Sequence, residues 1–293
     1  MRLSQLGKCN NYLYVSTAVA TKTISFPADV SFHFSSFLQS AGINIVPFVL
    51  ITIAIPAFNE EKLLPSTLSA VAKAGEAFAE RGWEIEVVVC DNNSTDHTGE
   101  IARVAGARVV FEEHNQISRA RNVAGRTAKG EWIIFVDGDS KPNKVLFEAT
   151  AEAMGNKAIV GGGATVKFEG GKKVPGAVLA AERIWNGISR VMCWPAGSYI
   201  FCRTKDFHEL NGFSEKLYAS EEIDFGRRLK KLGKKRQQRM QIFTQTPIST
   251  SDRKAYCISI GEILKLVFLW VFTTGRSVRK AENCGYWYDG QRR

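Results

Sequence analysis

The chain has 293 residues, and 39 lysines and arginines against 29 aspartates and glutamates give it a formal net charge of +10. A chain of this length can form one large domain or two small ones and bury a hydrophobic core in either case. Apolar residues make up 45% and charged residues 23%, which excludes a disordered or low-complexity chain. The mean hydropathy of −0.12 and the lack of a clean apolar run of about 20 residues exclude a multi-span membrane protein.

The two ends of the chain differ from its middle. Residues 1–48 contain one acidic residue, Asp29, and their apolar residues follow no clear period. The apolar run at 260–272 contains Glu262 and Lys265 and is too short to span a bilayer, so it predicts either a core helix or a helix in the membrane plane. We therefore predict a weakly structured extension at 1–48, a domain at 49–255, and a C-terminal apolar helix with a basic tail at 256–293.

Short apolar runs alternate with helical patterns from residue 49 to residue 139. The predicted strands are 49–56, 84–91, 107–111 and 131–139, and the predicted helices begin near residue 62, follow residues 94–96, and run through residues 120–127. Further strands are predicted at 158–168 and 196–202, and further helices at about 178–191 and 220–232. This order predicts an α/β fold with a mostly parallel, doubly wound central sheet and helices on both faces.

Three polar clusters lie at or just past the ends of predicted strands, at residues 56–61, 91–96 and 137–139. Because the carboxyl ends of parallel strands share one edge of a sheet, these clusters can meet around one ligand. Asp137 and Asp139 end a very apolar strand, and two neighbouring carboxylates of this kind favour a bound cation. Oxygen ligands alone suit Mg²⁺ or Mn²⁺.

A fourth acidic cluster opens the predicted helix at 220–232 with Glu221, Glu222 and Asp224. Carboxylates in a first turn stabilise a helix through its dipole, which explains such a cluster without any further role. A functional role requires one of them to point into the ligand site as a general base.

Four segments taken together resemble the ordered signature of family 2 glycosyltransferases with a GT-A fold, over about residues 50–255. They read IAIPAFNEE, VVVCDNNSTDHTGE, ARN with AKGEWIIFVDGDS, and NGFSEKLYASEEIDFGRRLKKLG. The resemblance implies a metal-dependent, inverting, hexosyltransferase-like enzyme. It would move a sugar from a UDP-, GDP- or dTDP-sugar to an acceptor hydroxyl.

The resemblance also implies roles for individual residues. Nucleotide-binding positions would be Pro56, Ala57, Phe58, Glu60, Asp91, Asn92, Arg121, Asp137 and Gly138. Asp137 and Asp139 would take the DxD role and hold Mn²⁺ or Mg²⁺, and Glu222 would be the general base. Glu221, Asp224 and Trp194 would lie on the acceptor side, and the sequence leaves open whether Glu221, Glu222 or Asp224 is the base.

The chain departs from the processive members of that family, because residues 236–240 read RQQRM where those enzymes have a Gln-x-x-Arg-Trp signature. A non-processive enzyme is therefore predicted. Two alternatives stay open: a catalytically inactive paralogue that binds nucleotide sugars, and a polyprenyl-phosphate sugar synthase that acts at the membrane.

The scattered cysteines form no CxxC pair and indicate a reduced, cytoplasmic protein. Eight basic residues fall between Arg227 and Arg239 without a nucleic-acid-binding motif, so nucleic acid is not an expected partner. This cluster and the apolar run at 260–272 instead suggest a peripheral membrane contact and an acceptor that is lipid-linked or a saccharide.

Overall fold

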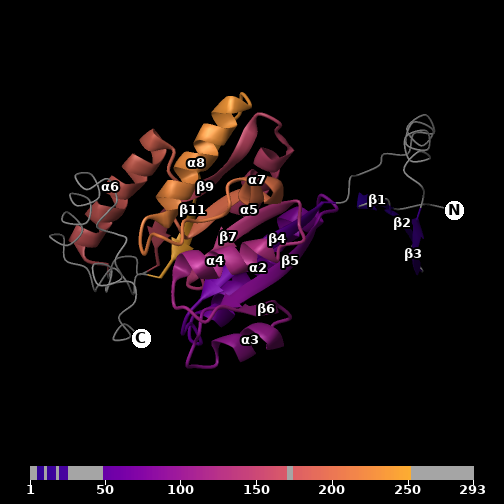
Figure 1. Ribbon diagram of the computed structural model, residues 1–293, viewed down its shortest axis with the longest axis horizontal. Coiled ribbons are helices and arrows are strands. Elements are labelled where there is room, and N and C mark those ends of the chain that lie inside the picture. Colours follow the sequence, from indigo (N-terminus) through magenta and orange to yellow (C-terminus); the bar gives the residue numbers. More distant parts are fainter. Residues whose placement is uncertain (1–4, 10–11, 18–19, 26–48, 170–173, 252–293) are drawn as a thin grey trace.

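The computed structural model describes residues 5–9, 12–17, 20–25, 49–169 and 174–251 (Figure 1). The predicted apolar helix at 260–272 and the whole C-terminal region at 256–293 lie outside these residues. Within residues 1–48, strands β1 (Gln5–Cys9), β2 (Tyr12–Thr17) and β3 (Ala20–Ser25) form an antiparallel three-stranded sheet. None of these three strands pairs with the large sheet of the domain.

The domain is built on one mixed sheet of eight strands in the order β6-β5-β4-β7-β10-β9-β11-β8. The strands are β4 (Leu50–Ala57), β5 (Glu84–Asp91), β6 (Arg108–Phe111), β7 (Trp132–Val136), β8 (Ser140–Lys141), β9 (Ile159–Phe168), β10 (Tyr199–Arg203) and β11 (Arg239–Thr250). The first four strands of this order are parallel, β10 is antiparallel to both of its neighbours, and β11 is parallel to β9. The α/β class and the parallel half of the sheet are confirmed.

Helices cover both faces of the sheet (Figure 1). They are α2 (Leu64–Ala79), α3 (Thr98–Val104), α4 (Ile117–Arg126), α5 (Lys144–Gly155), α6 (Gly176–Met192), α7 (Thr204–Glu209) and α8 (Glu221–Lys235). Successive side chains of a strand point to opposite faces. In β7 this places Ile134 in the core shared with α2 and α5, and Ile133 and Phe135 in the core shared with α4, α7 and α8.

The sequence did not predict α5, α7, β8 or β11. Strand β11 mixes polar and apolar residues without a regular alternation. It pairs with β9 across two register shifts, so its pairing is set by a partner far away in the sequence. Strand β7 ends at Val136, three residues before the predicted end, because Asp137 and Gly138 turn away from the sheet. In helix α6, the apolar side chains of Ile184 and Val191 are mostly exposed.

The topology separates two edges of the sheet. Strands β4, β5 and β7 all end at one edge, and the antiparallel pairing of Tyr199 with Val136 brings the start of β10 to the same edge. We call this the carboxyl edge. The end of β10, at Arg203, pairs with Trp132 and lies at the opposite edge.

Candidate active site

The first two polar clusters are joined at the carboxyl edge by hydrogen bonds that main-chain N–H groups donate. The Asn92 N–H donates to the carbonyl of Ala57 at 2.8 Å, and the Glu60 N–H donates to the Thr98 hydroxyl at 2.8 Å. Asn59, which has a left-handed backbone with φ of 53°, accepts from the Thr95 N–H at 2.7 Å. Pro56 and Ala57 therefore end β4 beside the loop that follows β5, as expected for residues that line one ligand.

The side chains of the second cluster serve two different purposes. Asp91, the last residue of β5, accepts from the Ser94 N–H at 2.9 Å and so closes its own loop. The amide of Asn92 is buried and donates to the carbonyls of Glu112 and His114 at 3.2 and 2.5 Å. Asn92 therefore fastens the loop after β6, and both of its amide bonds go to that loop.

The third cluster is packed directly against the first. A Cβ built on Gly138 would lie 3.2 Å from Cγ of Glu60 and 3.6 Å from Cβ of Ala57. The Thr67 hydroxyl of α2 donates to the Gly138 carbonyl at 2.9 Å, which fixes the turn between the two aspartates. Asp139 is buried, Asp137 is half-buried, and Phe58 is half-buried on the neighbouring loop.

A buried guanidinium links this turn to helix α8. Arg121 of α4 is 1% exposed. It donates to Asp137 Oδ1 at 2.8 Å, to Glu221 Oε1 at 2.6 Å and to the carbonyl of Gly197 at 2.9 Å. Burial alone would lower the pKa of Arg121, but the charges of Asp137 and Glu221 raise it well above its ordinary value. Arg121 is therefore a permanent cation that holds two carboxylates from separate elements.

Glu221 and Glu222 open α8 in contrasting surroundings. Glu221 is buried against Arg121, and burial raises its pKa although the nearby guanidinium opposes the shift. Glu222 is half-buried, and burial together with the charge of Glu221 raises its pKa to about 8. A carboxyl group with a pKa this close to neutrality can exchange a proton at physiological pH.

The other two predicted acceptor-side residues lie close by. Asp224 accepts from Arg228 Nε at 2.8 Å, and Arg228 in turn donates to the carbonyls of Leu210 and Gly212. Trp194 is half-buried in the loop between α6 and β10, where its backbone carbonyl accepts from the Ser189 hydroxyl at 2.6 Å. Trp194 belongs to the loop that leads into β10, and Asp224 belongs to the first turn of α8, where its carboxylate is engaged by Arg228 of the same helix.

Gly197 is a site residue that sequence reasoning missed. A Cβ at this position would lie 2.9 Å from Arg121 Nη2 and 3.6 Å from Glu222 Cγ. The glycine therefore lets its backbone approach both groups closely. It lies at the start of the strand predicted at 196–202, two residues before β10 begins, and no signal in the sequence marked it as a neighbour of Arg121.

The carboxylates of Asp137 and Asp139 suit a divalent ion that is coordinated by the protein and by a substrate phosphate together. Within the described ranges, no group of three or more His, Cys, Asp or Glu side chains could hold a metal by itself. Asp137 and Asp139 offer two carboxylates, and Mg²⁺ is commonly bound by one or two carboxylates together with substrate phosphates.

Among the described helices, none is long and apolar enough to cross a membrane.

Residues 52–208, just over half of the chain, match the family model named Glycosyl transferase family 2. The chain belongs to this family. It is 31% identical over 108 residues to the uncharacterized glycosyltransferase EpsJ of Bacillus subtilis. That match covers 35% of this chain and only 30% of EpsJ.

Solved structures of other glycosyltransferases share the fold. Staphylococcus aureus TarS in complex with UDP-GlcNAc matches with a TM-score of 0.51 and 24% identity, over 69% of this chain and 58% of that one. A mannosyltransferase from Pyrobaculum calidifontis in complex with GDP-Man and Mn²⁺ matches with a TM-score of 0.55 and 16% identity, over 69% and 56%. The predicted family, enzyme class and GT-A fold are confirmed, whereas the roles of individual residues remain predictions.

The close approach at Gly197 predicts a sharp effect of one methyl group. Gly197→Ala would push against Arg121, which is buried and fixed by its ion pairs and cannot move aside cheaply. We expect a loss of stability of about 1–3 kcal/mol in urea unfolding. Gly187→Ala is the matched control, because its Cβ meets nothing within 4 Å on α6 and should stabilise the helix slightly. Equal stabilities of the two variants would contradict the placement of Gly197.

The raised pKa of Glu222 predicts how stability depends on pH. The folded protein retains a proton that the unfolded chain releases between about pH 4.5 and 8, so the free energy of unfolding falls as pH rises through this window. Glu222→Gln mimics the protonated form and should match wild type near pH 4. Near pH 9 the melting temperature of Glu222→Gln should exceed that of wild type by at least about 3 °C. Glu152→Gln is an exposed control with the same change of charge, and its melting temperature should follow that of wild type at both pH values. An equal pH-dependent difference in Glu152→Gln would contradict the raised pKa of Glu222.

Proposed function

We propose that this chain moves a sugar from a nucleoside diphosphate donor to an acceptor hydroxyl, one sugar at a time and with inversion at the anomeric carbon. The observation that carries the proposal is the Arg121 contact, which ties the Asp137 turn to the first turn of α8 at the carboxyl edge. Ligands of open α/β sheets bind at this edge. A diphosphate site and a base site would then be parts of one rigid unit.

The donor class is supported by the fold neighbours together with the lining of the edge. TarS was solved with UDP-GlcNAc and the Pyrobaculum enzyme with GDP-Man, so the proposed donor is a sugar linked to a nucleoside diphosphate. Pro56, Ala57, Phe58 and Asp91 are assigned to the nucleoside, since they lie where β4 and β5 end. The buried amide of Asn92 holds the wall of this site through the loop after β6.

Asp137 and Asp139 are the proposed ligands of a divalent ion, Mn²⁺ or Mg²⁺. When bound, the ion neutralises negative charge on the departing diphosphate. Arg121 orients the Asp137 carboxylate by donating to its Oδ1, and Thr67 orients the turn through the Gly138 carbonyl. These contacts keep the two carboxylates in place before the donor arrives, which lowers the cost of organising the site.

Glu222 is the proposed general base among the three acidic residues that open α8. Glu221 is held by Arg121 and Asp224 by Arg228, whereas no described residue forms an ion pair with Glu222. In this reaction the Glu222 carboxylate takes the proton of the acceptor hydroxyl while the hydroxyl oxygen attacks the anomeric carbon. The bond to the diphosphate breaks in the same displacement, which inverts the configuration at that carbon.

The acceptor is assigned to the side of the site formed by Trp194 and the start of α8. A lipid-linked or saccharide acceptor agrees with a cytoplasmic protein that contacts the membrane surface through its basic residues. The exposed face of α8 supplies several of these, including Arg227, Lys231 and Lys234.

Turnover of the donor tests this proposal. With Mn²⁺ present, release of UDP from UDP-GlcNAc or of GDP from GDP-mannose would be followed with water or simple sugars as acceptors. We expect Glu222→Gln to lower kcat by about 10²–10⁴-fold and to leave donor affinity almost unchanged. Asp139→Ala should abolish metal-dependent donor binding in calorimetry.

Asp224→Asn is the matched control for the base, because it changes an acidic residue of the same helix turn that already pairs with Arg228. It should lower kcat by less than about tenfold. If Asp224→Asn or Glu221→Gln abolished turnover while Glu222→Gln did not, Glu222 would not be the base. Metal-dependent donor binding without turnover in wild type would identify a non-catalytic paralogue instead.

A further inference from the structure

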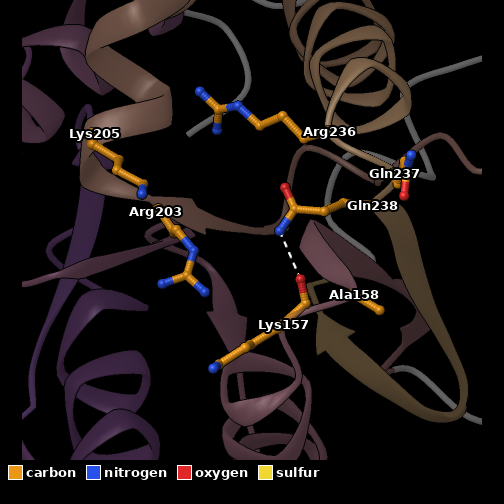
Figure 2. Close-up of a pocket in the computed structure, with 7 residues that line it drawn as sticks. All are labelled: Lys157, Ala158, Arg203, Lys205, Arg236, Gln237 and Gln238. Carbon is orange, nitrogen blue, oxygen red and sulfur yellow. Dashed lines mark hydrogen bonds between the residues drawn. The ribbon is translucent and has the colours of Figure 1, made fainter.

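A basic pocket opens at the edge of the sheet opposite the carboxyl edge (Figure 2). It encloses about 430 Å³, a volume within the range of small-molecule sites. Four basic and two amide side chains line it, and these are Lys157, Arg203, Lys205, Arg236, Gln237 and Gln238. They come from the turn before β9, the end of β10, the start of α7 and the turn after α8.

Two structural measures place this pocket far from the proposed donor site. Arg203 pairs with Trp132 at the start of β7, whereas Asp137 follows the end of that strand. Five residues of a strand span about 17 Å. Helix α8 begins at Glu221 beside Arg121 and ends at the pocket, and its 15 residues span about 22 Å. A donor bound at the carboxyl edge therefore leaves this pocket unoccupied.

The arginines of the pocket are held in place before any ligand binds. Arg236 pairs with the buried Asp206 at 2.6 Å and with Glu209. Arg203 pairs with Glu131 at 3.0 Å, and its guanidinium carbon lies 4.3 Å from the centre of the Trp132 ring. Guanidinium groups fixed in this way lose little freedom when they bind an anion.

The turn after α8 is fixed as well. Gln237 has a left-handed backbone with φ of 59°, and the Gln238 N–H donates to the carbonyl of Gly233 in a Schellman-type helix end. The Gln238 side chain donates to the Lys157 carbonyl at 2.7 Å, as the dashed line in Figure 2 shows. This bond ties the turn after α8 to the turn before β9, so two walls of the pocket keep a fixed separation.

The charges of the pocket do not cancel. Its four cations face three carboxylates, from Glu131, Asp206 and Glu209, which leaves one excess positive charge. Within the described part of the chain no carboxylate pairs with Lys157 or Lys205, so the excess lies on these exposed ammonium groups. Glu131 and Glu209 are more than half exposed and can yield their arginines to a stronger anion at little cost.

We propose that this pocket binds a phosphate or diphosphate group, carried either by a soluble phosphorylated molecule or by a lipid head group. Such a group has several oxygens and more than one negative charge. It can accept from the planar guanidinium groups of Arg203 and Arg236 and from the ammonium groups of both lysines together. A single carboxylate has too few oxygens to engage all four.

Calorimetry with inorganic pyrophosphate tests the pocket. The full chain is titrated at low salt in EDTA, which removes metal-dependent binding at the Asp137 turn. We expect the double variant Lys157→Gln/Lys205→Gln to bind about tenfold more weakly than wild type, because two charge-assisted contacts are lost. The control Lys73→Gln/Lys167→Gln removes the same charge from exposed positions of α2 and β9 outside the pocket and should bind within about twofold of wild type.

Vesicles of phosphatidylcholine with and without phosphatidic acid distinguish the two sources of the phosphate. Pyrophosphate binding that depends on Lys157 and Lys205 supports a soluble ligand. Sedimentation with phosphatidic acid vesicles that is lost in the pocket variant and kept in the control supports a lipid head group. Equal losses in the pocket and control variants, or no binding of wild type to either probe, would overturn the proposal. Unchanged melting temperatures show that both variants are folded.

Discussion

A single buried cation, Arg121, holds the candidate active site together. Its guanidinium joins the turn after β7, the first turn of α8 and the loop before β10, three elements that are distant in the sequence. Removing one partner of a buried ion pair costs about 3–5 kcal/mol, because the remaining charge stays out of water. These elements therefore keep their relative positions, and the close contacts at Gly138 and Gly197 leave little room for any of them to shift.

This arrangement also sets the electrostatics of the site. Arg121 compensates Asp137 and Glu221, whereas burial, together with the neighbouring carboxylate of Glu221, raises the pKa of Glu222 to about 8. One cation among the four carboxyl groups of Asp137, Asp139, Glu221 and Glu222 leaves the site short of positive charge, and a divalent ion on the Asp137 turn would supply it. The same helix that begins at this acidic site ends at the basic pocket, so α8 separates two regions of opposite charge.

The sequence predicted the parts of the fold whose signals are local. The apolar runs of β4, β5 and β7 are buried parallel strands, and such runs are visible in a single sequence. The convergence of the polar clusters followed from the shared edge of those strands. Pairing between distant segments could not be predicted, which is why β11 and the antiparallel place of β10 were missed. The direction of a side chain is equally nonlocal, so nothing in the sequence indicated that Asn92 binds the loop after β6 or that Gly197 touches Arg121.

The most direct test of this account is calorimetry of UDP and GDP with Mn²⁺ on wild type and on Arg121→Lys, together with turnover of the corresponding sugar donors. Lysine keeps the buried positive charge but cannot donate in the fixed fork that reaches Asp137 and Glu221 together. We predict a folded variant that loses at least about tenfold in metal-dependent nucleotide affinity and at least about tenfold in kcat. A folded Arg121→Lys protein with wild-type affinity and wild-type turnover would contradict the claim that this one contact organises both halves of the site.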